Sequence, residues 1–411
     1  MPKLVDELLA DYGTIPQKIG NFLMKKNEST SKSISSNTSL SNNQVINGLS
    51  FLIQRRFVRY FVYEKEVYYS LAKEMIYRRL LYSTYYCAVE DMFGPDITNR
   101  FVEILIAGFV EIECNTAAQD AIQSLVDEGI VCMLGKKEAS LFSMGSRCIV
   151  KNASKCTDDE NDVSVSKKNK VLNGKVFVMV DFDVLDSIVA RNKMQRFIQR
   201  KYLRKSKDIY ASILKCNLVT IDAVMGNLDQ SICFDISRSD VISCIKYFCN
   251  SGLLKKSMDG SDMYFRDVDE ERKILIIDCF CRILTNTNKH ALRLFNMMIH
   301  HKELEDKDIA LKSLICARSV KKALMMLHSN GFVNLKHLSS SESRPVLQWQ
   351  VDIGRSSKIV GEKIRKVLGE ILSSINIKWH VMRPDDEANA DEVMQLKSLH
   401  NLSADLFVIG L

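Results

Sequence analysis

The stretch MVDFDVLD holds acidic residues whose spacing could bind a metal ion. Asp181, Asp183 and Asp186 lie within six positions, and clustered aspartates of this kind hold magnesium in polymerase active sites. The glycine-bearing loop of such sites is missing, however, and the acids fall where a helix is expected to begin. Because carboxylates near a helix start interact favourably with the helix dipole, we interpret these residues as helix-start acids.

Other reactive residue types lack the spacing that chemistry requires. The pair His300-His301 has no cysteine or carboxylate at metal-ligand spacing. The twelve cysteines include no Cys-x-x-Cys pair, and no GxxxxGK or GxGxxG loop is present. We therefore expect no catalytic residue, no metal, no cofactor and no small-molecule substrate.

Composition indicates a water-soluble chain that can bury a core. Of its 411 residues, 46% are hydrophobic, and the formal net charge is +7. No uncharged apolar run is long enough for a membrane span, and MPKLVDELLADYG carries acids where a signal peptide needs apolar residues. We expect an intracellular protein without a membrane partner, because scattered free thiols suit a reducing compartment.

The strongest charge feature is RNKMQRFIQRKYLRKSK, residues 191–207, which has eight basic residues and no acid. At helical spacing its cations form one stripe, with Met194, Ile198 and Tyr202 on the opposite side. Two interpretations of this stripe are open: a face that is only solvated, or a surface that binds phosphates or an acidic segment of a partner. The stripe consists of Lys193, Arg196, Arg200, Arg204 and Lys207.

Tyrosines gather between Tyr60 and Tyr86, where eight of the thirteen occur among several arginines. Aromatic rings beside arginines could stack on the bases of single-stranded DNA. Cross-strand packing in a hairpin would also account for most of them. The arginines assigned to this candidate surface are Arg55, Arg56 and Arg59.

A short pattern occurs four times along the chain, at 45–58, 118–131, 241–254 and 320–333. Each copy is an amphipathic helix with apolar residues at i and i+3 and a third at i+8, just past the helix end. Glycine precedes that third residue in three copies, where a left-handed helix cap favours it. Arg56 takes this place in the first copy, which predicts a different helix exit there.

Each copy is followed by a hairpin-like stretch, and helical segments precede the first and the fourth. The serine-rich segment 33–44 is then the second helix, its turn and the start of the third, with Ile34 and Leu40 buried and Ser41 as N-cap. A disordered spacer is the alternative, since serine is a poor helix former. Helix, helix, helix and hairpin make a winged helix.

The fold class is therefore mostly α with small β wings, in four tandem winged-helix domains followed by a short C-terminal helical hairpin or coiled coil broken at Pro384. We place these domains at 1–75, 76–150, 176–268 with a basic leading helix, and 269–352. A polar, charged segment at 151–175 is the expected linker, and 353–411 holds the C-terminal helices.

Third helices of winged-helix domains can enter the major groove of DNA. Candidate contacts are Asn43 and Gln44 in the first domain, and Arg318, Lys321 and Lys322 in the fourth. The second copy carries three acids and no base, which argues against groove insertion there. At least one domain is thus expected to bind protein rather than DNA.

The order of elements and several motifs resemble the winged-helix subunit of RNA polymerase III. They include Ile15, Lys18, Ile19 and Gly20 in IPQKIG, and the later run Leu52-Ile53-Gln54. The resemblance is closest in the first hundred residues and in the fourth domain. That family is similar to the large subunit of TFIIE in using winged helices at a polymerase clamp.

The resemblance implies a nuclear, non-catalytic subunit of a DNA-directed RNA polymerase. Its expected partners are the polymerase III core at the clamp, two smaller specific subunits and the promoter-bound initiation factor, with DNA secondary. It would support recruitment, DNA opening and initiation at small RNA genes such as those of tRNA and 5S rRNA. The alternatives are a tandem winged-helix scaffold of a proteasome-lid, translation-initiation or endosomal-sorting complex, and a free-standing DNA-binding regulator.

Overall fold

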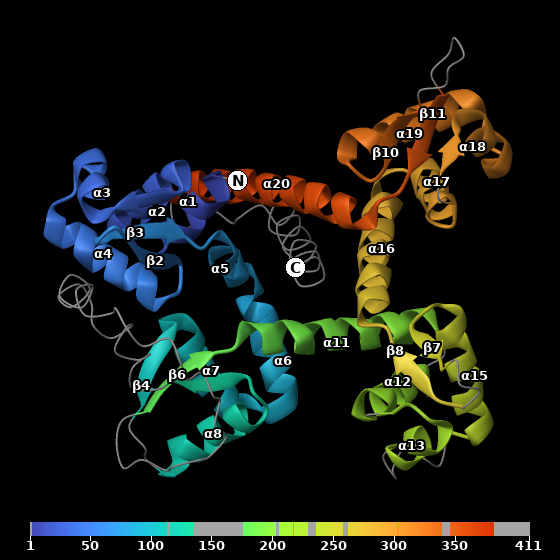
Figure 1. The fold of residues 1–411 in the computed structure, drawn as a ribbon, viewed down its shortest axis with the longest axis horizontal. Coiled ribbons are helices and arrows are strands. Elements are labelled where there is room, and N and C mark those ends of the chain that lie inside the picture. The colour runs from blue at the N-terminus through green and yellow to red at the C-terminus, as the bar shows by residue number, and fades with distance from the viewer. Residues whose placement is uncertain are drawn as a thin grey trace. The chain divides into compact units, whose positions relative to one another are not determined.

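The computed structural model describes residues 2–112, 116–134, 176–202, 205–216, 218–228, 236–257, 262–301, 303–338 and 346–381. The chain divides into two compact units, Met1–Ile188 with Arg365–His400 and Val189–Ile364 with Asn401–Leu411. Helices with small antiparallel sheets build both units (Figure 1). The predicted fold class, α with small β wings, is confirmed.

The first domain is a winged helix preceded by one extra helix. Its hairpin strands and a short first strand form a sheet of order β1-β3-β2, with β1 and β2 both antiparallel to β3. Its elements are α1 (Pro2–Ala10), α2 (Thr14–Lys26), β1 (Glu28–Thr30), α3 (Ser31–Thr38), α4 (Asn42–Gln54), β2 (Val58–Tyr63) and β3 (Glu66–Leu71).

The serine-rich segment is structured as predicted. It forms α3, the turn and the start of α4, and both Ile34 and Leu40 are buried. Ser41 accepts a hydrogen bond from the Gln44 backbone N–H, and the Gln44 side chain accepts one from the Ser41 N–H. This capping box fixes the start of α4, so the disordered-spacer alternative is wrong.

The second domain has a sheet of order β4-β6-β5 beside its helices. Strand β4 ends at Ile112 and α8 begins at Thr116, which leaves no room for another helix between them. Its elements are α5 (Lys73–Tyr77), a 3-10 turn (Arg78–Leu81), α6 (Tyr82–Phe93), α7 (Pro95–Ala107), β4 (Phe109–Ile112), α8 (Thr116–Asp127), β5 (Val131–Leu134) and β6 (Val176–Val180).

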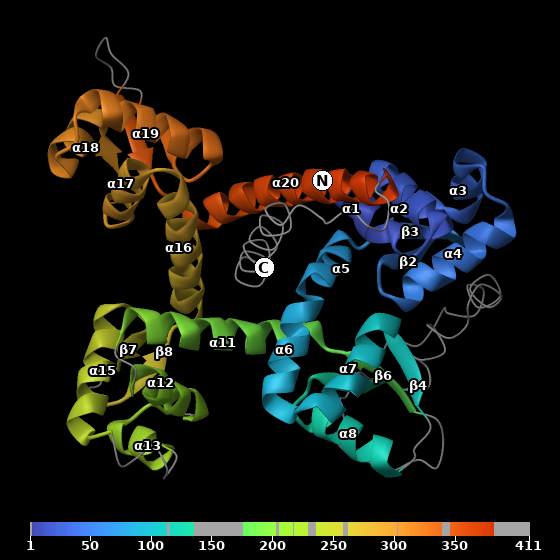
Figure 2. The ribbon, with the colours of Figure 1, turned by 180° about the vertical axis from the view of Figure 1, so that it is seen from behind.

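Strand β6 corrects the predicted boundary between the second and third domains. It pairs with both β4 and β5, and Figures 1 and 2 show it beside β4. Val178 and Val180 are buried, because a central strand covered by helices favours apolar residues. The boundary expected at 176 is therefore wrong, and the predicted linker 151–175 lies outside the described residues.

The third domain follows the long helix α11, which begins in the first unit and continues into the second from Val189. An isolated bridge from Val219 to Tyr264 stands where a first strand would lie. Residues 258–261, between the two strands of the hairpin expected there, lie outside the described residues. The elements are α11 (Phe182–Lys201), α12 (Lys205–Lys215), α13 (Ile221–Gly226), α15 (Arg238–Asn250), β7 (Leu254–Lys256) and β8 (Tyr264–Arg266).

The fourth domain follows α16 and has a sheet of order β10-β11-β9. One cluster of buried side chains extends from Met194 through α16 to Val360, so the two domains of this unit share a core. The helix predicted after Pro384 lies outside the described residues. The elements are α16 (Val268–Thr287), α17 (Lys289–Ile299), β9 (Leu304–Glu305), α18 (Asp306–Ser313), α19 (Ala317–Asn330), β10 (Asn334–Leu338), β11 (Val346–Gln350) and α20 (Ile353–Val381).

All twelve apolar anchors of the fourfold pattern are buried, as predicted. The different helix exit predicted for the first copy is wrong. Arg56 has a φ of 62°, in the same left-handed region as Gly129, Gly252 and Gly331. The Phe57 N–H donates to the Leu52 carbonyl at 2.8 Å, and Phe332 donates to Leu327 in the same way at 2.9 Å.

The glycine caps of the second and fourth copies differ in the space available for a side chain, and this difference can be tested. A Cβ on Gly331 would lie 2.4 Å from Ile359 Cγ2, whereas one on Gly129 would meet only Val184 Cγ2 at 3.8 Å. We expect Gly129→Ala to lower the free energy of unfolding by about 1 kcal/mol through backbone strain alone. Gly331→Ala should cost roughly 2–4 kcal/mol, because overpacking against Ile359 is added.

Calorimetric unfolding of both variants measures the difference. Equal losses would contradict the contact with Ile359.

Candidate nucleic-acid interface

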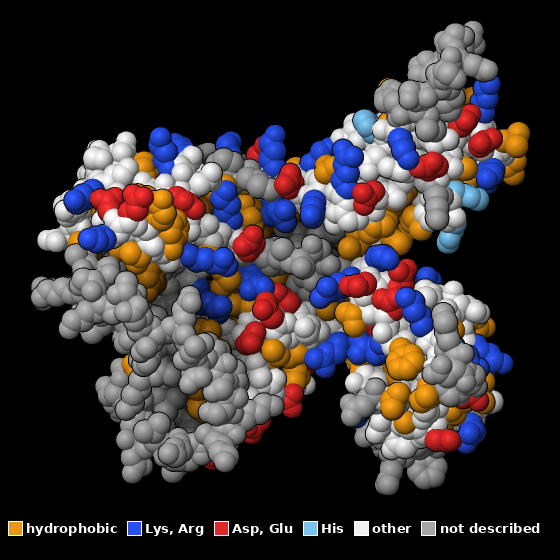
Figure 3. Space-filling view, viewed as in Figure 1, with side chains coloured by type: hydrophobic (Ala, Val, Ile, Leu, Met, Phe, Trp, Pro, Cys, Tyr) orange, Lys and Arg blue, Asp and Glu red, His pale blue; other side chains and the backbone are white. Residues whose placement is uncertain are grey.

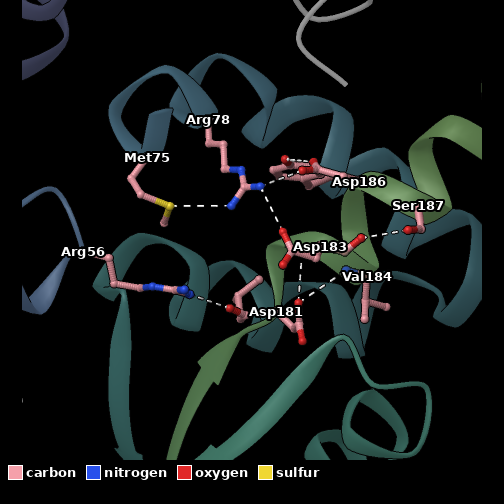
Figure 4. Close-up of polar contacts among 10 residues, drawn as sticks. Arg56, Met75, Arg78, Asp181, Asp183, Val184, Asp186 and Ser187 are labelled. Atoms are coloured by element: carbon pink, nitrogen blue, oxygen red, sulfur yellow. Dashed lines mark hydrogen bonds and ion pairs between the residues drawn. The ribbon is translucent and has the colours of Figure 1, made fainter. Parts of the chain in front are cut away.

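The acidic stretch at the start of α11 is occupied by structural contacts. Asp181 accepts hydrogen bonds from the backbone N–H groups of Asp183 and Val184, at 3.0 and 3.3 Å, and so caps the helix as predicted. Arg78 pairs with Asp183 at 3.2 Å and with Asp186 at 2.8 Å (Figure 4). Among the described residues, no group of three acidic, histidine or cysteine side chains could hold a metal.

Asp186 is the most perturbed acid of this cluster. Burial raises its pKa above the usual carboxyl range, while hydrogen bonds from the Tyr85 hydroxyl and Arg78 partly offset that rise. Burial and the neighbouring carboxylate also raise the pKa of Tyr85. The hydroxyl thus remains a donor that holds α6 to α11.

Two of the three arginines predicted near the first wing are engaged inside the fold. Arg55 stacks on the Phe51 ring at 3.8 Å from its centroid and also lies over Tyr12. Arg56, labelled in Figure 4, donates to the Val180 carbonyl at 2.8 Å. It also lies over the Phe182 ring, and burial lowers its pKa. Arg59 on β2 is exposed, so the three do not act as one surface.

Packing accounts for many of the clustered tyrosines. Tyr69, Tyr77 and Tyr85 are buried. The hairpin of the first domain is different, because Phe61 and Tyr63 are 40% and 59% exposed near its tip. The turn beside them holds Glu64 and Lys65, and Glu66 begins β3, so the hairpin tip has two acids and one base and offers no net positive charge to nucleic-acid phosphate.

The third helices of the first and second domains carry few groups that favour DNA. Asn43 and Gln44 are exposed at the start of α4, but the Gln44 side-chain oxygen is used in the capping box. Helix α4 holds no lysine or arginine. On α8, Asp120 and Asp127 are exposed, so that helix would repel phosphate.

The fourth domain brings three predicted cations together. Arg318, Lys321 and Lys322 are exposed on α19 at spacings of three and four residues, which places them on one side of the helix. None makes an ion pair with another residue in the part of the chain that the structure describes. They form the cationic face of α19.

The predicted basic stripe is interrupted. Helix α11 ends at Lys201 and α12 begins at Lys205, so Lys207 belongs to another helix; Arg204 lies outside the described residues. Tyr202 packs edge to face on Phe248 at the point where the chain leaves α11. The single stripe over 193–207 is therefore wrong.

A shorter basic face remains on α11. Arg196 is exposed and Lys193 is half-buried, and both lie on one side of the helix, whereas Arg191 is exposed on the side of Ile198, seven positions before it. Arg200 is also exposed but pairs with Asp278 of α16 at 3.2 Å. Met194 and Ile198 are buried on the opposite side, as predicted.

Sequence reasoning missed two exposed leucines beside the cationic face of α19. Leu311 on α18 and Leu314 in the following turn are 77% and 84% exposed. Alignment of the repeats could have revealed them, because the first domain has Ser36 and Ser39 at the corresponding positions.

Comparison with family models places the first domain among known proteins. A model described as the RNA polymerase III subunit RPC82 helix-turn-helix domain matches residues 3–63. Residues 3–63 are similar to the RPC82 helix-turn-helix domain. No curated protein matches the chain.

The RPC82 domain covers α1 to β2, so it includes the capped serine-rich helix and all of α4. The resemblance to a winged-helix subunit of RNA polymerase III is thereby confirmed for this domain. The match supports a role as an RNA polymerase III subunit in transcription. None of the helices in the described ranges combines the length and apolar character needed to cross a membrane.

The Asp186 cluster gives a directional pKa prediction. Because the Tyr85 hydroxyl lowers the Asp186 pKa, we expect Tyr85→Phe to raise that pKa further. Tyr86→Phe is the control, since the Tyr86 hydroxyl bonds Glu90 instead. Carboxyl titration by carbon-13 NMR measures the values, and an unchanged or lower pKa in Tyr85→Phe would contradict the hydrogen bond.

The raised pKa of Asp186 has a consequence for stability. A carboxyl whose folded pKa lies above its unfolded pKa contributes stability below the unfolded value, near 3.8. That contribution is lost as pH rises through the folded pKa. Asp186 therefore opposes the usual loss of stability in acid, which comes from carboxylates whose folded pKa is lowered.

Proposed function

We propose that this chain is a non-catalytic, RNA polymerase III-specific subunit. It docks on the polymerase clamp, forms a subcomplex with two smaller subunits and helps to recruit the promoter-bound initiation factor. In this way it supports DNA opening and initiation at small RNA genes, including those of tRNA and 5S rRNA. The observation that carries the proposal is the RPC82 match at residues 3–63, on a winged helix whose plan recurs through the chain.

A docking role fits the varied surfaces of the four domains. The third helix is neutral in the first domain, acidic in the second and cationic in the fourth. Four copies reading one DNA duplex would each need positive charge, because phosphate contacts dominate DNA affinity. Different charges instead favour different partners, with protein contacts primary and DNA secondary.

A non-catalytic role also fits the contacts of the acids. Asp181, Asp183 and Asp186 cap α11 or pair with Arg78. The Asp181 carboxylate is thus used within α11 itself, and those of Asp183 and Asp186 join α11 to the preceding helices of the first unit.

The test is affinity purification of the tagged full-length chain from native extract at moderate salt, with identification of partners by mass spectrometry. We expect the core and smaller subunits of RNA polymerase III to be recovered. Recovery of a proteasome, translation or sorting complex without polymerase subunits would contradict the proposal.

The basic face of α11 is tested in the same purification with Arg196→Glu. Arg196 makes no ion pair within the described ranges, so the fold should be unaffected. Lys246→Glu is a control with the same change of charge at an exposed position of the third domain.

We expect the first variant to lose polymerase subunits at least about tenfold relative to the control, a loss of about 1.4 kcal/mol. Retained subunits with weakened binding to duplex DNA would assign the face to DNA instead.

A further inference from the structure

The first and fourth domains correspond residue by residue across their helix-turn-helix segments. Positions 30–58 match 305–333 without insertion or deletion. The N-cap residues Thr30 and Glu305 share a φ of −85° and a ψ of 159°. Ser39 and Leu314, which end α3 and α18, have φ values of 56° and 55°. One backbone thus carries two different surfaces.

The difference is greatest at two positions that face solvent. Ser36 and Ser39 in the first domain are replaced by Leu311 and Leu314 in the fourth, and both leucines are largely exposed. The buried anchor of the segment is a separate residue, Ile34 or Ile309, with no exposed surface in either domain. The core therefore does not require the leucines.

Leu314 is also unfavourable for the backbone. Its left-handed conformation suits glycine or asparagine, and a bulky side chain there is strained. The same turn in the first domain tolerates serine. An exposed leucine in this conformation contributes nothing evident to the stability of the domain, which directs attention to binding.

Five cations lie on the two helices on either side of Leu314. Lys307 and Lys312 lie on α18, next to the cationic face of α19, and none of these five makes an ion pair with another described residue. Figure 3 shows hydrophobic surface at α18, with charged side chains beside it. Only one of the five corresponding positions in the first domain is a cation. These positions are Lys32, Asn37, Asn43, Ile46 and Asn47.

The acids on α18 do not cancel this charge. Asp306 accepts a hydrogen bond from the Trp349 indole and is thereby tied to the wing. Asp308 is exposed on the same helix and Glu305 is half-buried at its N-cap, which leaves five cations against three acids. An occupant of this surface needs apolar side chains for the leucines and negative charge for the cations.

We propose that the α18–α19 surface of the fourth domain binds an acidic segment of a partner protein that also carries apolar side chains. Its apolar residues cover Leu311 and Leu314, and its carboxylates meet the surrounding cations. Duplex DNA is a poorer match, because its phosphates would pair with the cations but its backbone has no apolar group to cover the leucines. The inference rests on the proposed function in that it adds the chemistry of one partner contact.

Site-specific photo-crosslinking identifies the occupant. A photoreactive benzoylphenylalanine replaces Leu314 in the tagged full-length chain, and the cross-linked peptide is sequenced after purification from native extract. We expect a protein segment in which Asp and Glu outnumber Lys and Arg and flank apolar residues. Cross-links to DNA alone, to a basic segment or to nothing would overturn the proposal.

Affinity measurements then test the contacts with a peptide synthesised from the cross-linked segment. We expect Leu311→Ser/Leu314→Ser to weaken binding to the full-length chain at least about tenfold, and Arg318→Glu/Lys322→Glu to do the same. Leu218→Ser/Val268→Ser is the control, because these apolar residues are half-exposed elsewhere in the same unit. Equal affinity of all variants would overturn the proposal.

Thermal unfolding of the leucine variant shows whether a loss of binding comes from a lost contact or from an unfolded domain. The serines of the first domain stand on the same backbone, so Leu311→Ser/Leu314→Ser should unfold at the same temperature as the original chain or higher. Polymerase subunits recovered with the cross-linked sample report on the proposed function separately. If polymerase subunits are recovered but no acidic segment is cross-linked at Leu314, only the docking proposal is contradicted. If an acidic segment is cross-linked but no polymerase subunit is recovered, only the polymerase assignment is contradicted.

Discussion

Every winged helix in this chain depends on one backbone device at the end of its third helix. A residue with positive φ reverses the chain, and the next side chain enters the core. In the first copy Arg56 and Phe57 do this, and in the fourth Gly331 and Phe332. This exit places the following strand against the helices, so the wing and the core depend on the same turn.

Arg56 shows how a non-glycine residue can hold this position. The left-handed backbone costs about 1 kcal/mol or more for an ordinary side chain. In return its guanidinium donates to the Val180 carbonyl and lies over Phe182. The strained turn of the first domain thus anchors the last strand of the second domain and the start of α11. Arg56 was predicted to be an exposed nucleic-acid contact, but it stabilises the fold instead.

Function varies over a constant backbone. The first and fourth helix-turn-helix segments share their cap geometry, yet one presents amides and serines and the other leucines and cations. Such repeats bury the same anchors and leave the solvent-facing positions free to differ. A polymerase subunit that contacts several partners can use each copy for a different surface.

Local pattern in the sequence determined much of this architecture. The spacing of anchors such as Leu49, Leu52 and Phe57 predicts the third helices, because helical periodicity and burial are both properties of neighbouring residues. Ser41 and Gln44 predict the start of α4 for the same reason. The RPC82 resemblance also rests on contiguous residues of the first domain.

Tertiary structure decided the rest. Strand β6 belongs to the second domain only because it pairs with β4 and β5, which lie far away in the sequence. The end of α11 at Lys201 follows the packing of Tyr202 on Phe248. Whether Arg56 or Leu314 is buried or exposed depends on elements distant in the chain, and such contacts leave no periodic trace in the sequence.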